Sequence, residues 1–172
     1  MNEFLRRLVI SLILPVVFLV GFPSAAVLLG DTNRISWLRE VPWNYLVLII
    51  GLLLITLGFV LLLRTIPLFL KLNEGTNMPW EPTTELIVEG VYRYVRNPMH
   101  VGVFSLMLGE GLILRSFSIL IFVTFAIILH LFYIPFSEER GLEKRFGEEY
   151  LVYKENVPRW IPRGTPWEPK DP

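Results

Sequence analysis

The sequence predicts an all-α integral membrane protein with about four transmembrane helices. Hydrophobic residues make up 53% of its 172 residues, and the mean hydropathy is +0.52. Only 19% of the residues are charged, below the roughly 25% of an ordinary soluble domain, and long stretches carry almost no charge. Sixteen basic residues balance sixteen acidic ones, so the net charge does not favour a nucleic-acid partner. The chain has no cysteine, which excludes disulfides, a thiolate nucleophile and cysteine-ligated metal.

Two apolar runs, residues 8–29 and 45–63, occupy the first part of the chain. At about 1.5 Å per residue, a helix of this length crosses a hydrocarbon core of roughly 30 Å. Two arginines precede the first run and small residues follow Pro23, so a cleavable signal peptide is an alternative there. The apolar residues continue beyond that point, which favours a span. The second run carries no charge until Arg64 and is the clearest span in the sequence.

Two further apolar runs, residues 99–114 and 117–135, are separated only by Arg115 and Ser116. So short a connection predicts a tight helical hairpin of antiparallel neighbours. Glu110 in the first of these runs lies about 7 to 8 Å along the helix from Arg115. Because an ionised group in lipid is costly, we expect Glu110 to pair with Arg115 or to extend to the far interface. For His130 in the second run, packing and a functional role are both open.

The distribution of basic residues predicts the orientation. Four spans place both termini on the same side as residues 64–98, and this side holds thirteen of the sixteen basic residues. The positive-inside rule therefore assigns both termini and the central segment to the cytoplasm. Residues 31–42 and the turn at 115–116 are predicted to lie on the opposite side.

The polar residues form two blocks, 64–98 and 137–172, which the hairpin should bring together. The second block begins as a helix with one apolar stripe, formed by Leu142, Phe146, Tyr150 and Tyr153. Gly147 should bend this helix, and four later prolines end it. We expect residues 1–162 to form a single membrane-embedded domain and residues 163–172 to be a poorly ordered, proline-rich tail.

The adjacent carboxylates Glu138 and Glu139 follow the last predicted span. Neither has a basic residue three or four positions further along the chain. One interpretation is an acidic first helical turn with Ser137 as its N-cap. The other is a binding site for a cationic ligand, because a carboxylate pair at the membrane surface suits an ammonium or sulfonium group.

Residues 90–102 read G-V-Y-R-Y-V-R-N-P-M-H-V-G and combine basic and aromatic side chains before an apolar run. Pro98 suits the start of a helix, and Gly102 allows close approach of another backbone. A simple membrane entry with snorkelling arginines would also explain this pattern. The only histidines are His100 and His130, with no HExxH motif and no Ser-His-Asp set, so no metal or hydrolytic site is predicted.

This segment resembles the Arg-His-Pro-x-Tyr-x-Gly motif of the isoprenylcysteine carboxyl methyltransferase and phospholipid methyltransferase superfamily. Residues 75–82 are similar to a Gly-Thr-Pro-x-Pro-Trp-x-Pro stretch in prokaryotic members. The second signature of that superfamily, Glu-Glu followed by Phe-Gly-x-x-Tyr-x-x-Tyr, is resembled by Glu138-Glu139, Phe146-Gly147, Tyr150, Tyr153 and the Val-Pro-Arg of residues 157–159. The resemblance covers residues 75–162, about half of the chain.

The resemblance implies a membrane enzyme that transfers a methyl group from S-adenosylmethionine (SAM) to a lipophilic acceptor, without a Rossmann domain and without metal. It implies a cofactor site at the cytoplasmic surface that a C-terminal helix completes, with the acceptor entering from the lipid. The carboxylates would hold the methionine ammonium of SAM, and Arg93 or Arg96 its carboxylate. The cofactor-binding residues carried over from the motifs are Tyr92, Arg93, Arg96, Asn97, Pro98, Gly102, Glu138 and Glu139.

Three residues depart from the family pattern. Asn97 stands where the motif usually has His, and it can still donate a hydrogen bond to a carboxylate. His100 stands where the motif usually has Tyr, either as a catalytic base for an acceptor that loses a proton or as a packing residue. Asn156 stands where eukaryotic isoprenylcysteine enzymes commonly have Arg, which argues against a prenylcysteine carboxylate as acceptor.

Two other functions are compatible with the sequence. Sterol-type membrane reductases that use NADPH carry a segment similar to the first motif, although they are usually much longer. A membrane scaffold with a degenerate site would need no ligand. Binding of SAM, of NADPH or of neither separates the three hypotheses.

Overall fold

The structure is a computed structural model that describes residues 40–72 and 85–169, together with the isolated positions 21 and 25. The predicted span 8–29 and the motif at residues 75–82 lie outside the two described segments. The described segments are helical and contain no strand. The main helices are α3 (Trp43–Leu72), α4 (Pro98–Leu114), α5 (Phe117–Tyr133) and α6 (Glu139–Asn156).

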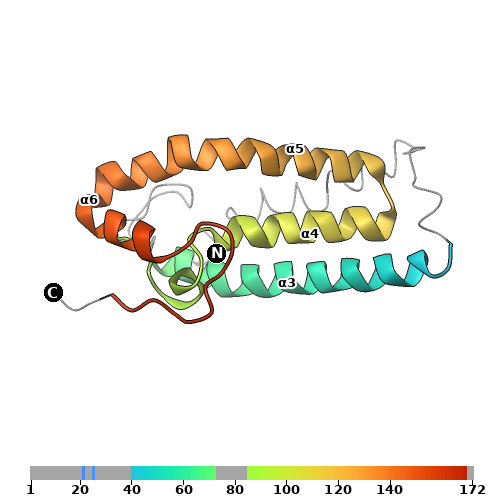
Figure 1. Ribbon diagram of the computed structural model, residues 1–172, viewed down its shortest axis with the longest axis horizontal. Coiled ribbons are helices and arrows are strands. Elements are labelled where there is room, and N and C mark those ends of the chain that lie inside the picture. Colours follow the sequence, from blue (N-terminus) through green and yellow to red (C-terminus); the bar gives the residue numbers. More distant parts are fainter. Residues whose placement is uncertain (1–20, 22–24, 26–39, 73–84, 170–172) are drawn as a thin grey trace, which may run out of the picture.

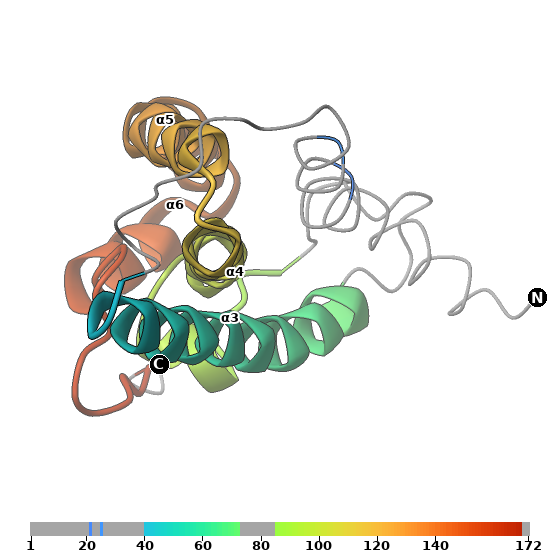
Figure 2. The same ribbon diagram turned by 90° about the vertical axis from the view of Figure 1, so that its right-hand side faces the viewer.

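Two short elements complete the described fold: the 3₁₀ turn η3 (Gly90–Arg93) and the π-helical turn η4 (Ile134–Glu138). The helices α3, α4 and α5 run alongside one another, and α6 turns back at one end (Figure 1). Viewed along the bundle, α4 lies between α3 and α5 (Figure 2). All the large apolar side chains exposed on these three helices belong to α3 and α5, and none to α4. The central helix is therefore covered by its neighbours, while the outer two present apolar side chains outward.

Two described helical stretches are long and apolar enough to cross a membrane, Trp43–Leu68 and Phe117–Asn156. Pro98–Leu114 is apolar but shorter. On the outer helices, side chains such as Leu53 and Phe125 are more than 60% exposed. Water would penalise such a surface, whereas lipid would not, so these features are those of a membrane protein.

Helix α3 is longer than the predicted span 45–63. It continues past Arg64 to Leu72 and includes Pro67. The hydroxyl group of Thr65 is fully buried and donates to the carbonyl oxygen of Leu61, 2.9 Å away. A charged residue marks the end of an apolar run, but it does not interrupt the backbone hydrogen bonds of a helix. The sequence pattern therefore located the apolar part of α3 and not its end.

Glycines hold α3 and α4 at very short distance. Gly58 lies opposite Gly102, and Gly51 lies opposite Gly109, as expected for antiparallel helices. A Cβ atom on Gly58 would lie 2.5 Å from the carbonyl oxygen of Gly102, and one on Gly109 would lie 2.7 Å from that of Gly51. Small residues allow this contact between helix backbones. The prediction that Gly102 permits close backbone approach is confirmed.

The predicted hairpin turn at Arg115 and Ser116 is confirmed. Arg115 adopts the left-handed conformation with φ 53°, and the Ser116 hydroxyl accepts a hydrogen bond from the backbone N–H of Ile119, 3.2 Å away. The expected pairing of Glu110 with Arg115 is wrong. Because Arg115 lies beyond the last helical turn, its side chain leaves the face of α4 and donates to the Asn44 side chain at the start of α3.

The chain passes from α5 into α6 without a break. The π-turn η4 includes Pro135, which cannot donate a backbone hydrogen bond, and α6 follows directly at Glu139. Ser137 lies inside this turn and makes no cap, so the interpretation of Ser137 as an N-cap is wrong. The predicted bend at Gly147 is confirmed, because this residue has φ 53° and ψ −128°, outside the helical region.

Candidate active site at the end of the α4–α5 hairpin

Backbone hydrogen bonds join the first motif to the C-terminal segment. The N–H of Arg96 donates to the carbonyl of Pro158 (2.9 Å), that of Arg163 to Tyr94 (3.0 Å), and that of Trp167 to Arg93 (2.9 Å). These residues come from the two polar blocks of the sequence. The prediction that the hairpin brings the two blocks together is thus confirmed.

The expectation of a poorly ordered tail is wrong for the described part, residues 163–169. Arg93 donates from Nε to the carbonyl of Trp167 (2.7 Å) and pairs with Glu168 (2.8 Å). The Trp167 ring lies 5.8 Å from that of Tyr153. Proline prevents a helix here but leaves an extended chain free to pair with another segment. Arg93, predicted to bind the cofactor, is occupied by these contacts.

Glu139 is the most buried carboxylate of the site, with 3% of its side chain exposed, and it lies among three cations. Arg159 donates two hydrogen bonds to it, at 2.6 and 2.9 Å. Arg96 Nη1 lies 3.0 Å away and Lys154 Nζ 3.6 Å away. Burial opposes its ionisation, but the Arg159 hydrogen bonds and the three positive charges outweigh this effect and hold the pKa of Glu139 below its usual range. Glu139 therefore ties the first motif to the C-terminal segment.

Tyrosine side chains from α6 also bond to residues of the first motif. The Tyr153 hydroxyl donates to the carbonyl of Tyr92 (2.8 Å), and Arg96 donates to the Tyr150 hydroxyl over 3.4 Å. Burial raises the pKa values of Tyr92 and Tyr150 to about 12. Both hydroxyl groups are thus neutral near neutral pH, and that of Tyr150 accepts a hydrogen bond from Arg96.

Two buried donors of the first motif have no hydrogen-bond partner in the structure. They are Nε of Arg96 and Nδ2 of Asn97. A buried donor without an acceptor is costly, and such groups often mark a ligand site. Both are N–H donors on neighbouring residues, so an anionic oxygen group such as a carboxylate fits them.

Glu138 is next to Glu139 in the sequence but differs from it in its surroundings. Its side chain is 37% exposed, and its nearest basic group is His100, with 3.8 Å between Oε1 and Nε2. Burial raises the pKa of Glu138, which His130 opposes and the neighbouring Glu139 reinforces. No arginine or lysine forms an ion pair with Glu138 among the described residues, so this carboxylate can accept a cationic ligand.

The structure separates the other predicted site residues. Pro98 is buried at the first position of α4, and Gly102 faces α3 rather than the charged cluster. Sequence reasoning did not assign site roles to Arg159 or Lys154. Arg159 belongs to the Val-Pro-Arg of the second signature, which is a signal that could have identified it. Lys154 reaches Glu139 only because α6 bends at Gly147, and no sequence spacing indicates that.

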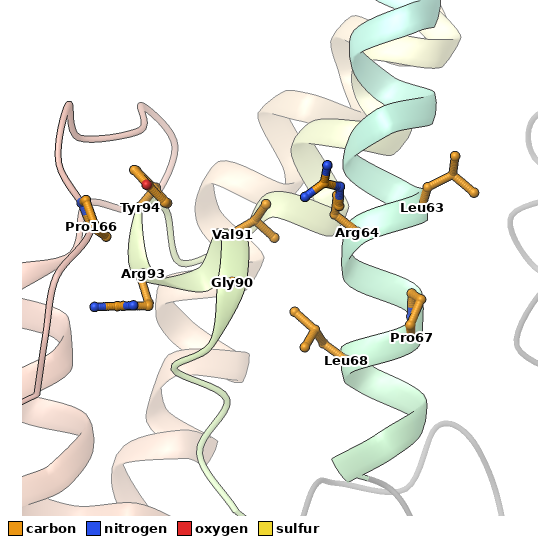
Figure 3. Close-up of a pocket in the computed structure, with 9 residues that line it drawn as sticks. All are labelled: Leu63, Arg64, Pro67, Leu68, Gly90, Val91, Arg93, Tyr94 and Pro166. Atoms are coloured by element: carbon orange, nitrogen blue, oxygen red, sulfur yellow. The ribbon is translucent and has the colours of Figure 1, made fainter.

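An apolar cavity of about 560 Å³ adjoins the first motif on the α3 side. In Figure 3, Arg64 and Leu68 of α3 face Gly90 and Val91 of η3 across it. Its remaining lining residues are Leu63, Pro67, Arg93, Tyr94 and Pro166. The Arg93 side chain points away from α3, in keeping with its bonds to the C-terminal segment (Figure 3).

The fold and the site define a helical membrane protein whose polar residues gather at one end of a helical hairpin. Comparison with known families gives the more specific assignment. The phospholipid methyltransferase family matches residues 46–149, which include most of α3, all of α4 and α5, and the carboxylate pair. The chain belongs to this family.

Among curated proteins, the chain is similar to enzymes named protein-S-isoprenylcysteine O-methyltransferase. The human protein is 30% identical over 137 residues, which are 76% of this chain and 46% of the relative. The Xenopus laevis protein is 30% identical over 158 residues, which are 87% of this chain and 50% of the relative. The Schizosaccharomyces pombe protein is 38% identical over 80 residues, which are 45% of this chain and 33% of the relative. The chain thus spans half or less of the length of these relatives.

Proposed function

We propose that this protein transfers a methyl group from SAM to a lipophilic acceptor at the cytoplasmic surface of a membrane. Membership of the phospholipid methyltransferase family and similarity to isoprenylcysteine O-methyltransferases support the reaction class. The observation that carries the proposal is the pair of buried, unpartnered donors on Arg96 and Asn97, together with two carboxylates at the same motif: Glu139 lies 3.0 Å from Arg96, and Glu138 lies 3.8 Å from His100.

The charges of the site suit the amino-acid end of SAM. Arg96 Nε and Asn97 Nδ2 would donate to its carboxylate, and Glu138 would accept from its ammonium. Glu139 is already neutralised by three cations, so we assign to it the positioning of Arg96 rather than the main ammonium contact. Tyr92, Pro98 and Gly102 would hold the motif backbone in place.

The sulfonium group of SAM supplies an already activated methyl group. The protein therefore has to align the acceptor with the methyl carbon and exclude water. A site at the end of a helical hairpin suits this task, because lipid covers the outer faces of α3 and α5 while the polar end remains open to a soluble ligand. We further propose four spans with both termini in the cytoplasm, as the distribution of basic residues predicts.

Ligand-dependent thermal stabilisation of the purified full chain tests the proposal. We expect SAM and S-adenosylhomocysteine to raise the unfolding temperature and NADPH to leave it unchanged. At a ligand concentration 100 times Kd, the gain in stability is about 2.7 kcal/mol. Stabilisation by NADPH would instead favour a reductase, and stabilisation by neither would favour a scaffold.

A further inference from the structure

The apolar cavity between α3 and η3 carries one charge that the protein does not neutralise. Of the nine described residues that line it, two are arginines and none is acidic. Arg93 turns away and pairs with Glu168, whereas Arg64 forms no ion pair or hydrogen bond within the described part of the chain. Figure 3 shows the Arg64 guanidinium on the side of α3 that faces Val91. A cation beside an apolar cavity favours an amphipathic ligand with a negative charge.

The position of Arg64 along α3 places the cavity at the edge of the hydrocarbon layer. Residues 45–63 carry no charge. At about 1.5 Å per residue they span about 28 Å, close to the roughly 30 Å thickness of that layer. Arg64 directly follows this run, so its charge lies at the level of lipid phosphates.

An exposed apolar stripe leads from Arg64 into the hydrocarbon layer. Leu53, Leu57 and Val60 precede Arg64 at spacings of four, three and four residues, which places them on the same face of α3. Their exposed fractions are 64%, 48% and 46%. An acyl chain would fit along this stripe while a headgroup lies in the cavity.

The cavity has walls from three separate segments. Besides α3 and η3, Pro166 of the C-terminal segment lines it, and the next residue, Trp167, donates its backbone N–H to the carbonyl of Arg93 over 2.9 Å. The cavity volume of about 560 Å³ lies within the range of roughly 300 to 1,000 Å³ that is typical of ligand pockets. An arginine that merely extends to the membrane surface would explain Arg64 but not the walled cavity beside it.

Pro67 supplies the cavity with a hydrogen-bond acceptor. Because proline has no backbone N–H, the carbonyl oxygen of Leu63, four residues earlier in α3, lacks its helical donor. Both residues line the cavity. A glycerol headgroup has hydroxyl groups that would donate to this oxygen, whereas a choline headgroup has no donor.

We propose that this cavity binds the headgroup of an anionic phospholipid, with its phosphate at Arg64 and an acyl chain along the exposed stripe of α3. The inference is independent of the proposed methyl transfer, and the lipid is a bound ligand rather than the methyl acceptor. The headgroup would contact η3, which lies three residues before Arg96 in the chain. A bound lipid would therefore support the first motif from the α3 side.

Lipid titration followed by native mass spectrometry tests the site. The full chain in detergent micelles is titrated with dioleoylphosphatidylglycerol (DOPG) or dioleoylphosphatidylcholine (DOPC), and Kd is measured for the first bound lipid. We expect DOPG to bind about tenfold more tightly or better. Glycerol 1-phosphate, which has the charge without the chains, should not displace DOPG at equal concentration. Equal affinity for the two lipids would overturn the inference, and displacement by glycerol 1-phosphate would indicate a site for free anions instead.

Two variants change the cavity in different ways. Arg64→Gln removes the charge, whereas Val91→Phe adds apolar volume and keeps the charge. We expect each to weaken DOPG binding by about tenfold. The matched control is Arg145→Gln, which removes an exposed basic residue of α6 and should stay within about twofold of wild type. Wild-type affinity in both cavity variants, or an equal loss in the control, would overturn the inference.

A competing amphipathic anion separates this site from an acceptor site. N-acetyl-S-farnesylcysteine also joins a negative charge to an apolar chain, but we expect it to leave DOPG bound. Displacement of DOPG by this compound would make the cavity an acceptor site and would overturn the inference. The titrations contain no SAM, so a failure of the chain to bind SAM would contradict the proposed function alone.

Discussion

Arg159 donates two parallel hydrogen bonds to Glu139, from Nε to Oε1 over 2.6 Å and from Nη2 to Oε2 over 2.9 Å. Glu139 is the first residue of α6 and Arg159 lies three residues beyond its end at Asn156, so the bend at Gly147 falls between them. The bond therefore closes α6 and the following segment into a loop. Arg96 lies 3.0 Å from the same carboxylate, so one buried anion joins three parts of the site.

Removal of the Glu139 charge should destabilise the protein at neutral pH. Glu139→Gln leaves Arg96, Arg159 and Lys154 close together without a shared anion. Loss of one partner from a buried ion pair costs about 3 kcal/mol or more, and in a protein of this size that lowers Tm by roughly 5 to 10 °C. Thermal unfolding in detergent measures the effect. The matched control is Glu149→Gln, an exposed carboxylate on the same helix.

The difference between wild type and Glu139→Gln should depend on pH. The folded-state pKa of Glu139 lies below its ordinary value of 4.5, so its charge stabilises the folded protein above that value. This contribution disappears as the pH falls through the lowered folded-state pKa. We expect the Tm difference to be constant from about pH 6 to 8 and to shrink below about pH 4. A difference that stayed constant down to pH 3 would contradict the assigned role of Glu139.

Glu138 and Asn97 should contribute to SAM affinity. Each would supply one charge-assisted hydrogen bond worth about 1.5 to 3 kcal/mol, or roughly ten- to a hundredfold in Kd. We expect Glu138→Gln and Asn97→Ala to weaken binding by this factor in isothermal titration calorimetry. Glu148→Gln and Glu149→Gln, which remove exposed negative charges from α6, are the controls. Equal binding by all four variants would rule out this site.

The glycine contacts between α3 and α4 should tolerate no side chain. A Cβ atom on Gly58 would lie 2.5 Å from the backbone oxygen of Gly102, so Gly58→Ala must push the helices apart. We expect a loss of about 1 to 3 kcal/mol. Gly141→Ala in α6 is the control, since a Cβ atom there meets no atom within 4 Å, and it should stabilise by up to about 1 kcal/mol. Thermal unfolding compares the two variants.

The proposed topology can be tested by cysteine labelling, because the chain has no native cysteine. Single cysteines at positions Thr32 and Thr165 should react with an impermeant maleimide from opposite sides of sealed, oriented vesicles. The Thr165 cysteine should be labelled from the cytoplasmic side. Labelling of both from one side would contradict the four-span arrangement.

Local chemistry and hydropathy predicted much of the helical fold. Apolar runs located α3, α4 and α5, and the Arg115-Ser116 pair located the hairpin turn. Both signals are local, because they depend on residues that are neighbours in the sequence. Pro98 marked the start of α4, and Gly147 marked the bend in α6. The predicted end of α3 was wrong, since the side-chain pattern reports where the apolar surface stops and not where backbone hydrogen bonding stops.

Motifs in the sequence identified most residues of the candidate site, but only the tertiary structure decided their partners. Glu139 has no basic residue three or four positions further along its helix, yet it lies among Arg96, Lys154 and Arg159, which are remote from it in the sequence. Arg93 turns to Trp167 and Glu168, in a region that composition alone describes as a tail. Electrostatic and hydrogen-bonding energies depend on distances in space, and such distances between remote residues are set by helix packing and by the bend at Gly147.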